Sequence, residues 1–225
     1  MNIVMVKHLI LKDWFFLRPA ILAYLLIGAI ATLLLRAGSE GAFFAGSILL
    51  ITVMITVGIH MVMLTVVTER TEHTLAFVMS LPISPTEYTT AKIVANVVIF
   101  LVPWLLLLLG PIAMIMFVPD IPDGLIPFVV VIMGEIFVSY CLLLAVALVS
   151  ESQGWAIGAI ITGNLSFQAF LYWVSHIPGV QAANQSTSLV WDHSIVNILI
   201  AEIVTIALLL GVTFMLQGRK RDFIV

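Results

Sequence analysis

One imidazole and two carboxyl groups lie inside long apolar stretches of the chain: those of His60, Glu135 and Glu202. Charged groups are costly in hydrocarbon, so such residues are functional candidates by default. A carboxyl group there either lines a path for a substrate or a proton, or packs between helices as a hydrogen-bonded group. For Glu135 both uses stay open. Glu202 lies nearer the end of its stretch and is expected to be reached by water, whereas His60 is expected to hydrogen-bond between helices.

Neutral polar residues and glycines give a second set of candidates. Asn164 and Gln168 are amides within one apolar stretch, and they are candidates for lining a path. In the same stretch Gly154 and Gly158 form a G-x-x-x-G pattern, whose small residues let a second helix approach closely.

Motifs for hydrolytic or nucleotide chemistry are absent from the sequence. It has no G-x-x-x-x-G-K-[ST] phosphate loop, no H-E-x-x-H and no G-x-S-x-G. His176 and the adjacent pair Asp192-His193 do not have the spacing of metal ligands. The basic tail Arg219-Lys220-Arg221 suits anionic lipid rather than nucleic acid. We therefore expect no enzyme activity, no metal site and no nucleic-acid partner.

The amino-acid composition indicates the class of protein that holds these residues. The chain has 225 residues, of which 62% are hydrophobic and 9% are charged. A soluble domain carries roughly 25% charged residues, so the composition predicts an integral membrane protein. The single cysteine, Cys141, excludes a disulfide within one chain.

Six apolar runs predict an all-α integral membrane protein with six transmembrane helices in a single domain. Each run has about the 17–25 residues that a helix needs to cross the hydrocarbon core. The runs are approximately Pro19–Leu35, Ala42–Val67, Ile93–Val118, Leu125–Val149, Gly154–Val174 and Ile195–Leu216.

The first 18 residues mix basic and apolar side chains. Lys7, Lys12 and Arg18 alternate with leucine, isoleucine and aromatic residues, which is typical of an amphipathic helix at the membrane interface. Pro19 would then turn the chain into the first span. The alternative is that residues 1–18 simply lengthen that span.

The distribution of basic residues predicts the orientation, because lysine and arginine accumulate on the cytoplasmic side. With the N-terminus inside, eight of the nine basic residues face the cytoplasm, and Arg36 alone faces the other side. We therefore expect both termini and the 68–92 loop to be cytoplasmic, in a plasma or bacterial inner membrane. The 175–194 loop is then extracytoplasmic.

The 68–92 loop is the longest polar interval between spans. Ser84-Pro85-Thr86-Glu87 reads as a capping box that starts a helix at Pro85, continuous with the third span. Before it, Thr71–Met79 is predicted to form two helical turns with Leu75, Val78 and Met79 on one face. This face suits a helix-in-groove contact with a partner, or a contact with lipid or another span.

This loop resembles the first cytoplasmic loop of type-2 ABC exporter permeases, which has the form E-[RK]-x-x-G-T-L…L-P-[IV]-S…K. The matching residues are Glu69, Arg70, Thr74, Leu75, Leu81, Pro82, Ile83, Ser84 and Lys92, while His73 replaces the usual glycine. Together with the six spans and the interfacial helix, the resemblance covers nearly the whole chain.

The resemblance implies a permease subunit whose loop forms a coupling helix that docks on a separate cytoplasmic ABC ATPase. Two ATPase copies would bind ATP and Mg, and this chain would hold no cofactor. The docking residues carried over are Glu69, Arg70, Glu72, Thr74, Leu75, Phe77, Val78, Met79 and Pro82. The family also pairs with a second permease copy or homologue, which makes Gly154 and Gly158 candidates for a dimer face.

The same family places a short hairpin between the last two spans, in the position of residues 175–194 here. Pro178-Gly179 is expected to form a turn in it, with Val180, Leu189, Val190 and Trp191 on its apolar side. The scarcity of charge in the spans favours an amphipathic or apolar substrate, such as a drug, lipid or peptide.

Two other functions remain open at the level of sequence. One is an ion-coupled secondary transporter or channel that uses Glu135 or Glu202 and needs no ATPase. The other is a membrane scaffold that uses the 68–92 loop only to recruit a cytoplasmic partner.

Overall fold

The computed structural model of the chain describes residues 3–37, 39–72, 85–118, 121–150 and 152–218, without the side chains of residues 3–6, 70, 85 and 86. Within these residues the regular elements are all helical. They are α1 (Ile3–Leu35), α2 (Glu40–Val62), the π-helical turn η1 (Met63–Val67), α3 (Thr68–Thr71), α5 (Pro85–Phe117), α6 (Leu125–Ser150), α7 (Gln153–Ser175), α8 (Pro178–Asn184) and α9 (His193–Gly218).

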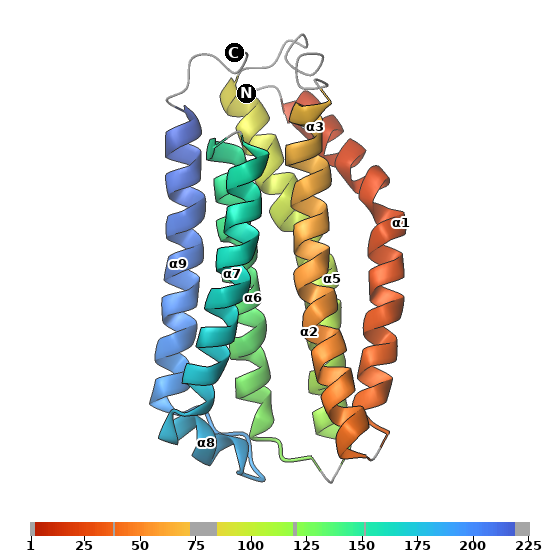
Figure 1. The fold of residues 1–225 in the computed structure, drawn as a ribbon, viewed down its shortest axis with the longest axis vertical. Helices are drawn as coiled ribbons and strands as arrows, with labels where there is room; N and C mark the ends of the chain where they lie inside the picture. Colours follow the sequence, from red (N-terminus) through yellow and green to blue (C-terminus); the bar gives the residue numbers. More distant parts are fainter. Residues whose placement is uncertain (1–2, 38, 73–84, 119–120, 151, 219–225) are drawn as a thin grey trace.

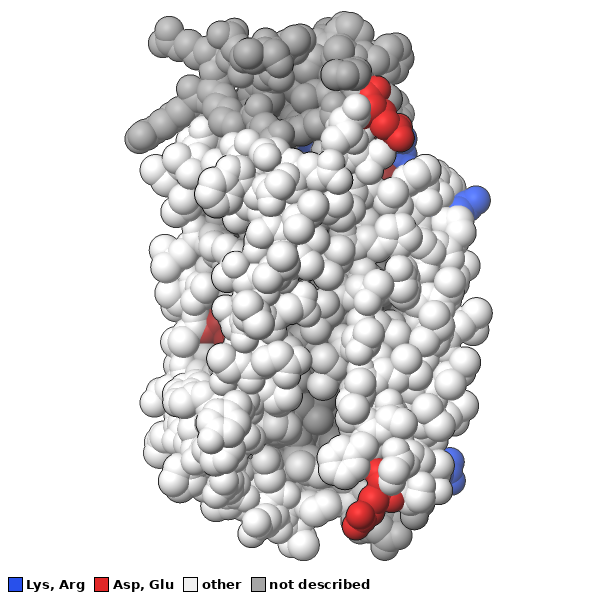
Figure 2. Space-filling view, in the orientation of Figure 1, with Lys and Arg blue, Asp and Glu red and all other residues white. Residues whose placement is uncertain are grey.

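Six of these helices are long and apolar enough to cross a membrane: α1, α2 with η1, α5, α6, α7 and α9. Figure 1 shows them side by side in one elongated bundle. Their outward faces carry large apolar side chains, such as Leu26 and Leu165, which are 68% and 67% exposed. Figure 2 shows that, on this face, most charged groups lie toward the two ends, and that the broad belt between them is uncharged apart from a small acidic patch at its left edge. The predicted all-α architecture with six candidate spans is confirmed for the described residues. An exposed apolar belt of this extent fits a lipid environment and supports a multi-pass membrane protein.

The ends of the bundle follow from the helix directions. One end of the bundle contains the first residues of α1 and α5, the last residues of α9, and α3 (Figure 1). This end is called the N-terminal end here. Helices α6 and α9 begin at the opposite end, where α8 lies.

Helix α1 corrects the expected separation of an N-terminal helix from the first span. It runs unbroken for 33 residues, with Pro19 inside it. Proline removes an amide donor and bends a helix without having to end it, and Figure 1 shows the beginning of α1 slanting relative to the rest. Residues 3–18 are thus the first part of one bent helix. Its amphipathic character is real, since Leu9, Asp13 and Leu17 are buried at four-residue spacing while Phe16 is 64% exposed.

The second span continues through η1 into α3 without a break. The predicted helix start at Pro85 is confirmed, and α5 continues into the third span. The predicted helix at Thr71–Met79 and the Ser84 cap lie outside the described residues, apart from Thr71, which ends α3, and Glu72.

Close helix contacts depend on particular glycines. A Cβ at Gly46 would lie 2.7 Å from the carbonyl oxygen of Ala31, so glycine lets α2 approach the backbone of α1. A Cβ at Gly58 would lie 2.9 Å from the ring of Tyr140, which stacks on Phe100 with ring centroids 3.9 Å apart. These contacts join α2, α5 and α6 in the core.

The connection before α9 differs from the expected turn. Pro178 is the first residue of α8, where its missing amide donor costs nothing. Of the four residues expected on its apolar side, Val180 is buried, whereas Leu189, Val190 and Trp191 are 40–50% exposed. Gly124 donates its amide to the carbonyl of Ser186 at 3.1 Å, which ties this connection to the start of α6.

Candidate functional site

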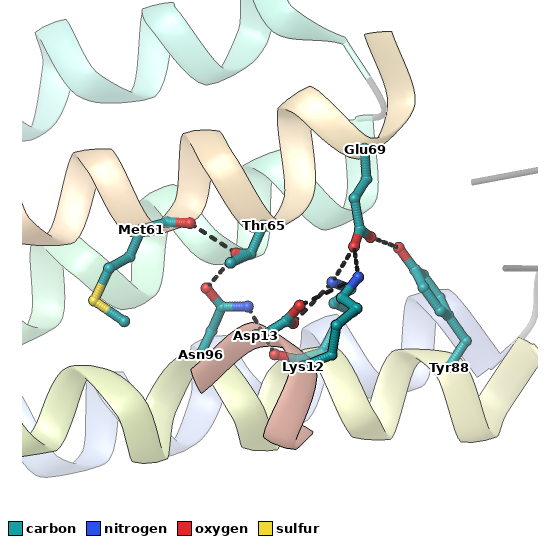
Figure 3. Close-up of polar contacts among 8 residues, drawn as sticks. Lys12, Asp13, Met61, Thr65, Glu69, Tyr88 and Asn96 are labelled. Atoms are coloured by element: carbon teal, nitrogen blue, oxygen red, sulfur yellow. Dashed lines mark hydrogen bonds and ion pairs between the residues drawn. The ribbon is translucent and has the colours of Figure 1, made fainter. Parts of the chain in front are cut away.

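Four charged side chains from three helices meet at the N-terminal end of the bundle and are called the charge cluster here. Lys12 and Asp13 lie on α1, Glu69 on α3 and Lys92 on α5. Lys92 Nζ lies 2.9 Å from both Asp13 Oδ2 and Glu69 Oε1. Lys12 Nζ lies 2.6 Å from Glu69 Oε1 and 3.4 Å from Asp13 Oδ1. Figure 3 shows the side chains converging from the three helices.

Apolar neighbours explain how these charges become buried. Asp13 lies between Leu9 and Leu17 on the buried face of α1, so the packing of those leucines carries the carboxylate inward. Lys92 lies one turn from Tyr88 and one turn from Asn96, and all three are 1% exposed. Asp13 is 3% and Glu69 9% exposed, whereas the Lys12 side chain is half exposed.

Hydrogen bonds extend the charge cluster into the core. The Tyr88 hydroxyl donates to Glu69 Oε2 at 3.3 Å. The side-chain amide of Asn96 donates to the Lys92 carbonyl at 3.0 Å. The Thr65 hydroxyl lies 2.9 Å from Asn96 Oδ1 and 2.7 Å from the Met61 carbonyl oxygen. These contacts link the π-helical turn, which contains Thr65, to α5 (Figure 3).

Charge is balanced within the cluster, with two carboxylates against two ammonium groups. Burial raises the pKa of the Glu69 carboxyl, but the charge of Lys92 and the hydrogen bonds from Lys12 and Lys92 outweigh it. The pKa of Glu69 therefore lies below its ordinary value of 4.5, and the group is ionised at neutral pH. Replacing a buried ion pair whole by apolar residues is often neutral, whereas removing one partner alone is strongly destabilising.

The cluster borders the residues predicted to dock a partner. Glu69 and Lys92 flank residues 73–84 on either side, and Asp13 and Lys12 hold both flanks to α1. The structure therefore places Glu69 inward, with its carboxylate engaged within the chain, while Glu72 is exposed. The side chain of Arg70 lies outside the described residues, as do Thr74, Leu75, Phe77, Val78, Met79 and Pro82.

The path candidates do not all meet. Glu202 on α9 is 6% exposed and packs over Gly134 of α6, next to the half-buried Glu135. Glu202 is thus the more enclosed carboxyl of the two, contrary to the expectation that water reaches it. Asn164 is half-buried in a cleft between α2, α5, α6 and α7, and Gln168 is exposed.

His60 behaves as predicted. Its Nδ1 lies 2.9 Å from the Tyr24 hydroxyl, so it makes a hydrogen bond between α2 and α1. Gly154 and Gly158 lie on a face of α7 where a Cβ at position 158 would meet nothing within 4 Å. That face leaves room for another helix or for lipid.

The sequence did not lead us to predict three of the side-chain contacts in this site, those made by Lys12, Asp13 and Tyr88. A signal for Asp13 was present, because a carboxylate between Leu9 and Leu17 stands on the apolar face of an amphipathic helix. A buried charge on such a face requires a partner of opposite charge.

The chain was compared with protein-family models, with curated proteins and with solved structures, and none of them matches it.

Proposed function

We propose that the chain is the membrane-spanning permease subunit of an ATP-driven exporter, and that its 68–92 loop docks on a separate cytoplasmic ATPase. The chain supplies the translocation path and the docking surface, and its partner hydrolyses ATP. Two permease subunits, identical or homologous, pair with two ATPase subunits in a bacterial inner membrane, with both termini on the cytoplasmic side.

The charge cluster is the observation that supports this proposal best. It ties both flanks of residues 73–84 to α1 through Asp13, Lys92 and Glu69, at 2.9 Å for each contact of Lys92. A force applied to the loop would therefore reach α1, the second span and α5 together. Transmission by packed, rigid elements is what rigid-body coupling requires.

The basic residues support the orientation. Lys7, Lys12, Arg18 and Lys92 belong to the part of the bundle near its N-terminal end, while Arg36 follows α1 at the opposite end. An excess of lysine and arginine marks the cytoplasmic side. The substrate proposed is apolar or amphipathic, since the spans hold few charges and the path must pass through them.

The first test is a pull-down of the tagged protein from native membranes in mild detergent, with the retained proteins identified by mass. The wild type is compared with Leu75→Asp/Val78→Asp, which puts two charges on the proposed docking face. A carboxylate forced into a buried interface without a partner costs about 3–5 kcal/mol. We expect an ATPase in the wild-type sample and its loss in the variant.

A matched control is Leu189→Asp/Val190→Asp. These residues are exposed and lie between α8 and α9, at the opposite end of the bundle. The control variant should retain the ATPase. If the wild type retains no ATPase, or if both variants lose it equally, the docking proposal is wrong, and an ion-coupled transporter without an ATPase becomes the better description.

A second variant separates docking from coupling. Asp13→Asn/Lys92→Met removes one acid and one base, and so keeps the cluster neutral while releasing α5 from α1. The ATPase should still be retained, but its stimulation by substrate should fall. Unchanged stimulation would exclude the charge cluster as the coupling element.

A further inference from the structure

One carboxyl group in the middle of the bundle has no partner within the described part of the chain. Glu202 is 6% exposed, and its Oε1 is buried without a hydrogen bond. It lies nine residues from the start of α9, which is about 14 Å along the helix axis. That depth is close to the middle of a hydrocarbon core about 30 Å thick.

The neighbouring helix leaves a place for this carboxyl. Gly134 of α6 lies directly under it, and a Cβ at position 134 would overlap Glu202 Oε2. Glu135 is the next residue of α6, and its carboxyl lies within electrostatic range of Glu202. Two carboxyl groups are therefore brought together from α6 and α9, and the one on α9 is buried.

The helices packed against α9 carry no lysine, arginine or histidine along α6, along α8 or along the Ile93–Phe117 part of α5. Helix α9 packs against α6, α5 and α8. Helix α6 contributes Glu135, Tyr140 and Cys141 as ionisable groups, α5 has none between Ile93 and Phe117, and α8 has none. On α9 itself the other ionisable group is His193, at its first residue. No ion pair of Glu202 or Glu135 occurs among the residues that the structure describes.

An ionised carboxylate in this setting would carry a large desolvation cost and would be repelled by Glu135. A buried group in that position neutralises itself by taking up a proton. A metal ion is a poorer fit, because the described residues gather no set of three or more side chains of the ligating types. The ligand that fits a buried carboxyl without a cationic partner is a proton.

We propose that Glu202, seated over Gly134 and beside Glu135, is a proton-binding site inside the membrane-spanning bundle. A proton from water forms an O–H bond on the Glu202 carboxylate, which leaves a neutral carboxylic acid. Its release to water restores the negative charge next to Glu135. This site goes beyond the proposed function and does not depend on the ATPase.

The test uses the full-length protein in detergent or liposomes, with dicyclohexylcarbodiimide as the probe. This apolar reagent adds a protonated carboxyl across its C=N bond, the acid proton moves to the reagent nitrogen, and the adduct rearranges to a stable N-acylurea. Peptide mass spectrometry then locates the adduct. We expect modification of Glu202 at neutral pH, and none at the exposed carboxylates Glu40 and Glu72, which act as internal controls.

The variant Glu135→Gln tests the pairing. It replaces the neighbouring carboxyl with a neutral amide of similar shape, so the ionised form of Glu202 is no longer opposed by a second carboxylate. The pH of half-maximal labelling should therefore shift downward relative to the wild type. An unchanged pH profile would exclude Glu135 from the site.

Infrared spectroscopy gives a second readout that needs no reagent access. The carbonyl band of a protonated carboxyl should be present at neutral pH in the wild type and lost in Glu202→Gln. Absence of both this band and the adduct in the wild type would overturn the proposal. Suppression of labelling by Na⁺ at constant pH would also overturn it, because the ligand would then be a monovalent cation.

Discussion

The ammonium group of Lys92 lies 2.9 Å from the carboxylate of Asp13, although 79 positions separate the two residues in the chain. Both side chains are buried, at 1% and 3% exposure. The contact fixes the first part of α1 to the beginning of α5, so two segments near the ends of different spans behave as one unit. Glu69 completes this unit, because its carboxylate pairs with the same ammonium group at 2.9 Å.

Replacing Lys92 by methionine should strongly destabilise the protein. The change removes the ammonium group that contacts both Asp13 and Glu69, whose carboxylates stay buried, and breaking a buried pair costs about 3–5 kcal/mol. Thermal unfolding in detergent, followed by circular dichroism, measures the loss. Lys7→Met is the control, because Lys7 is exposed on the same helix as Asp13 and should change stability little. Adding Asp13→Asn to Lys92→Met should recover part of the loss, and no recovery would argue against the pairing.

Acid should weaken the protein through Glu69. The folded-state pKa of Glu69 lies below 4.5, so the unfolded chain binds a proton on this group more readily than the folded chain does. Its contribution to stability is present above about pH 4.5 and is lost as the pH falls through the folded-state pKa. The difference in unfolding free energy between wild type and Glu69→Gln should therefore shrink in acid. A difference that stays constant from neutral pH into that range would contradict the ionised, paired state of Glu69.

Gly46→Ala should push α1 and α2 apart. The added Cβ would lie 2.7 Å from the carbonyl oxygen of Ala31 and 2.9 Å from the amide nitrogen of Leu35, and backbone atoms cannot move aside as a flexible side chain can. Overpacking of this kind costs about 1–3 kcal/mol. Gly211→Ala is the matched control on α9, where a Cβ meets nothing within 4 Å. Since alanine is a better helix former by about 1 kcal/mol, the control should be neutral or stabilising.

If α7 faces a second copy of the chain, Gly158→Cys should form cross-linked dimers in native membranes. A short bis-maleimide and a denaturing gel measure them. The wild type supplies the baseline, because its cysteine, Cys141, is buried. Gly211→Cys is the control, since it too faces open space but lies on α9. Equal cross-linking at both positions would indicate random collision and would remove Gly158 from the proposed dimer face.

The architecture was largely predictable because hydrophobic length alone identifies a spanning helix. Six long apolar helices are found where the sequence predicted spans, although the first begins before Pro19, and α5 begins at Pro85 as predicted. The contact of His60 was also predictable, because a polar ring in an apolar stretch can hydrogen-bond only to a polar group on a neighbouring helix. His60 makes such a hydrogen bond with Tyr24.

The departures arise where local patterns compete with tertiary packing. Pro19 was expected to separate two segments, but a helix can bend at proline and continue when its neighbours hold both parts. The pairing of Asp13 with Lys92 needs the relative placement of α1 and α5, which sequence spacing does not contain. Glu202 was expected near water, yet the contact with Gly134 encloses it, and that contact depends on how α6 and α9 pack.

The π-helical turn Met63–Val67 takes up one residue more than an α-helix would over the same rotation. Deleting one residue within it would restore an ordinary α-helix and leave Glu69 facing the same direction. Deleting one residue elsewhere in α2 would rotate Glu69 by about 100° away from Lys92, because an α-helix turns once every 3.6 residues. The turn is thus a place where the chain can change its length during evolution while Glu69 keeps its orientation.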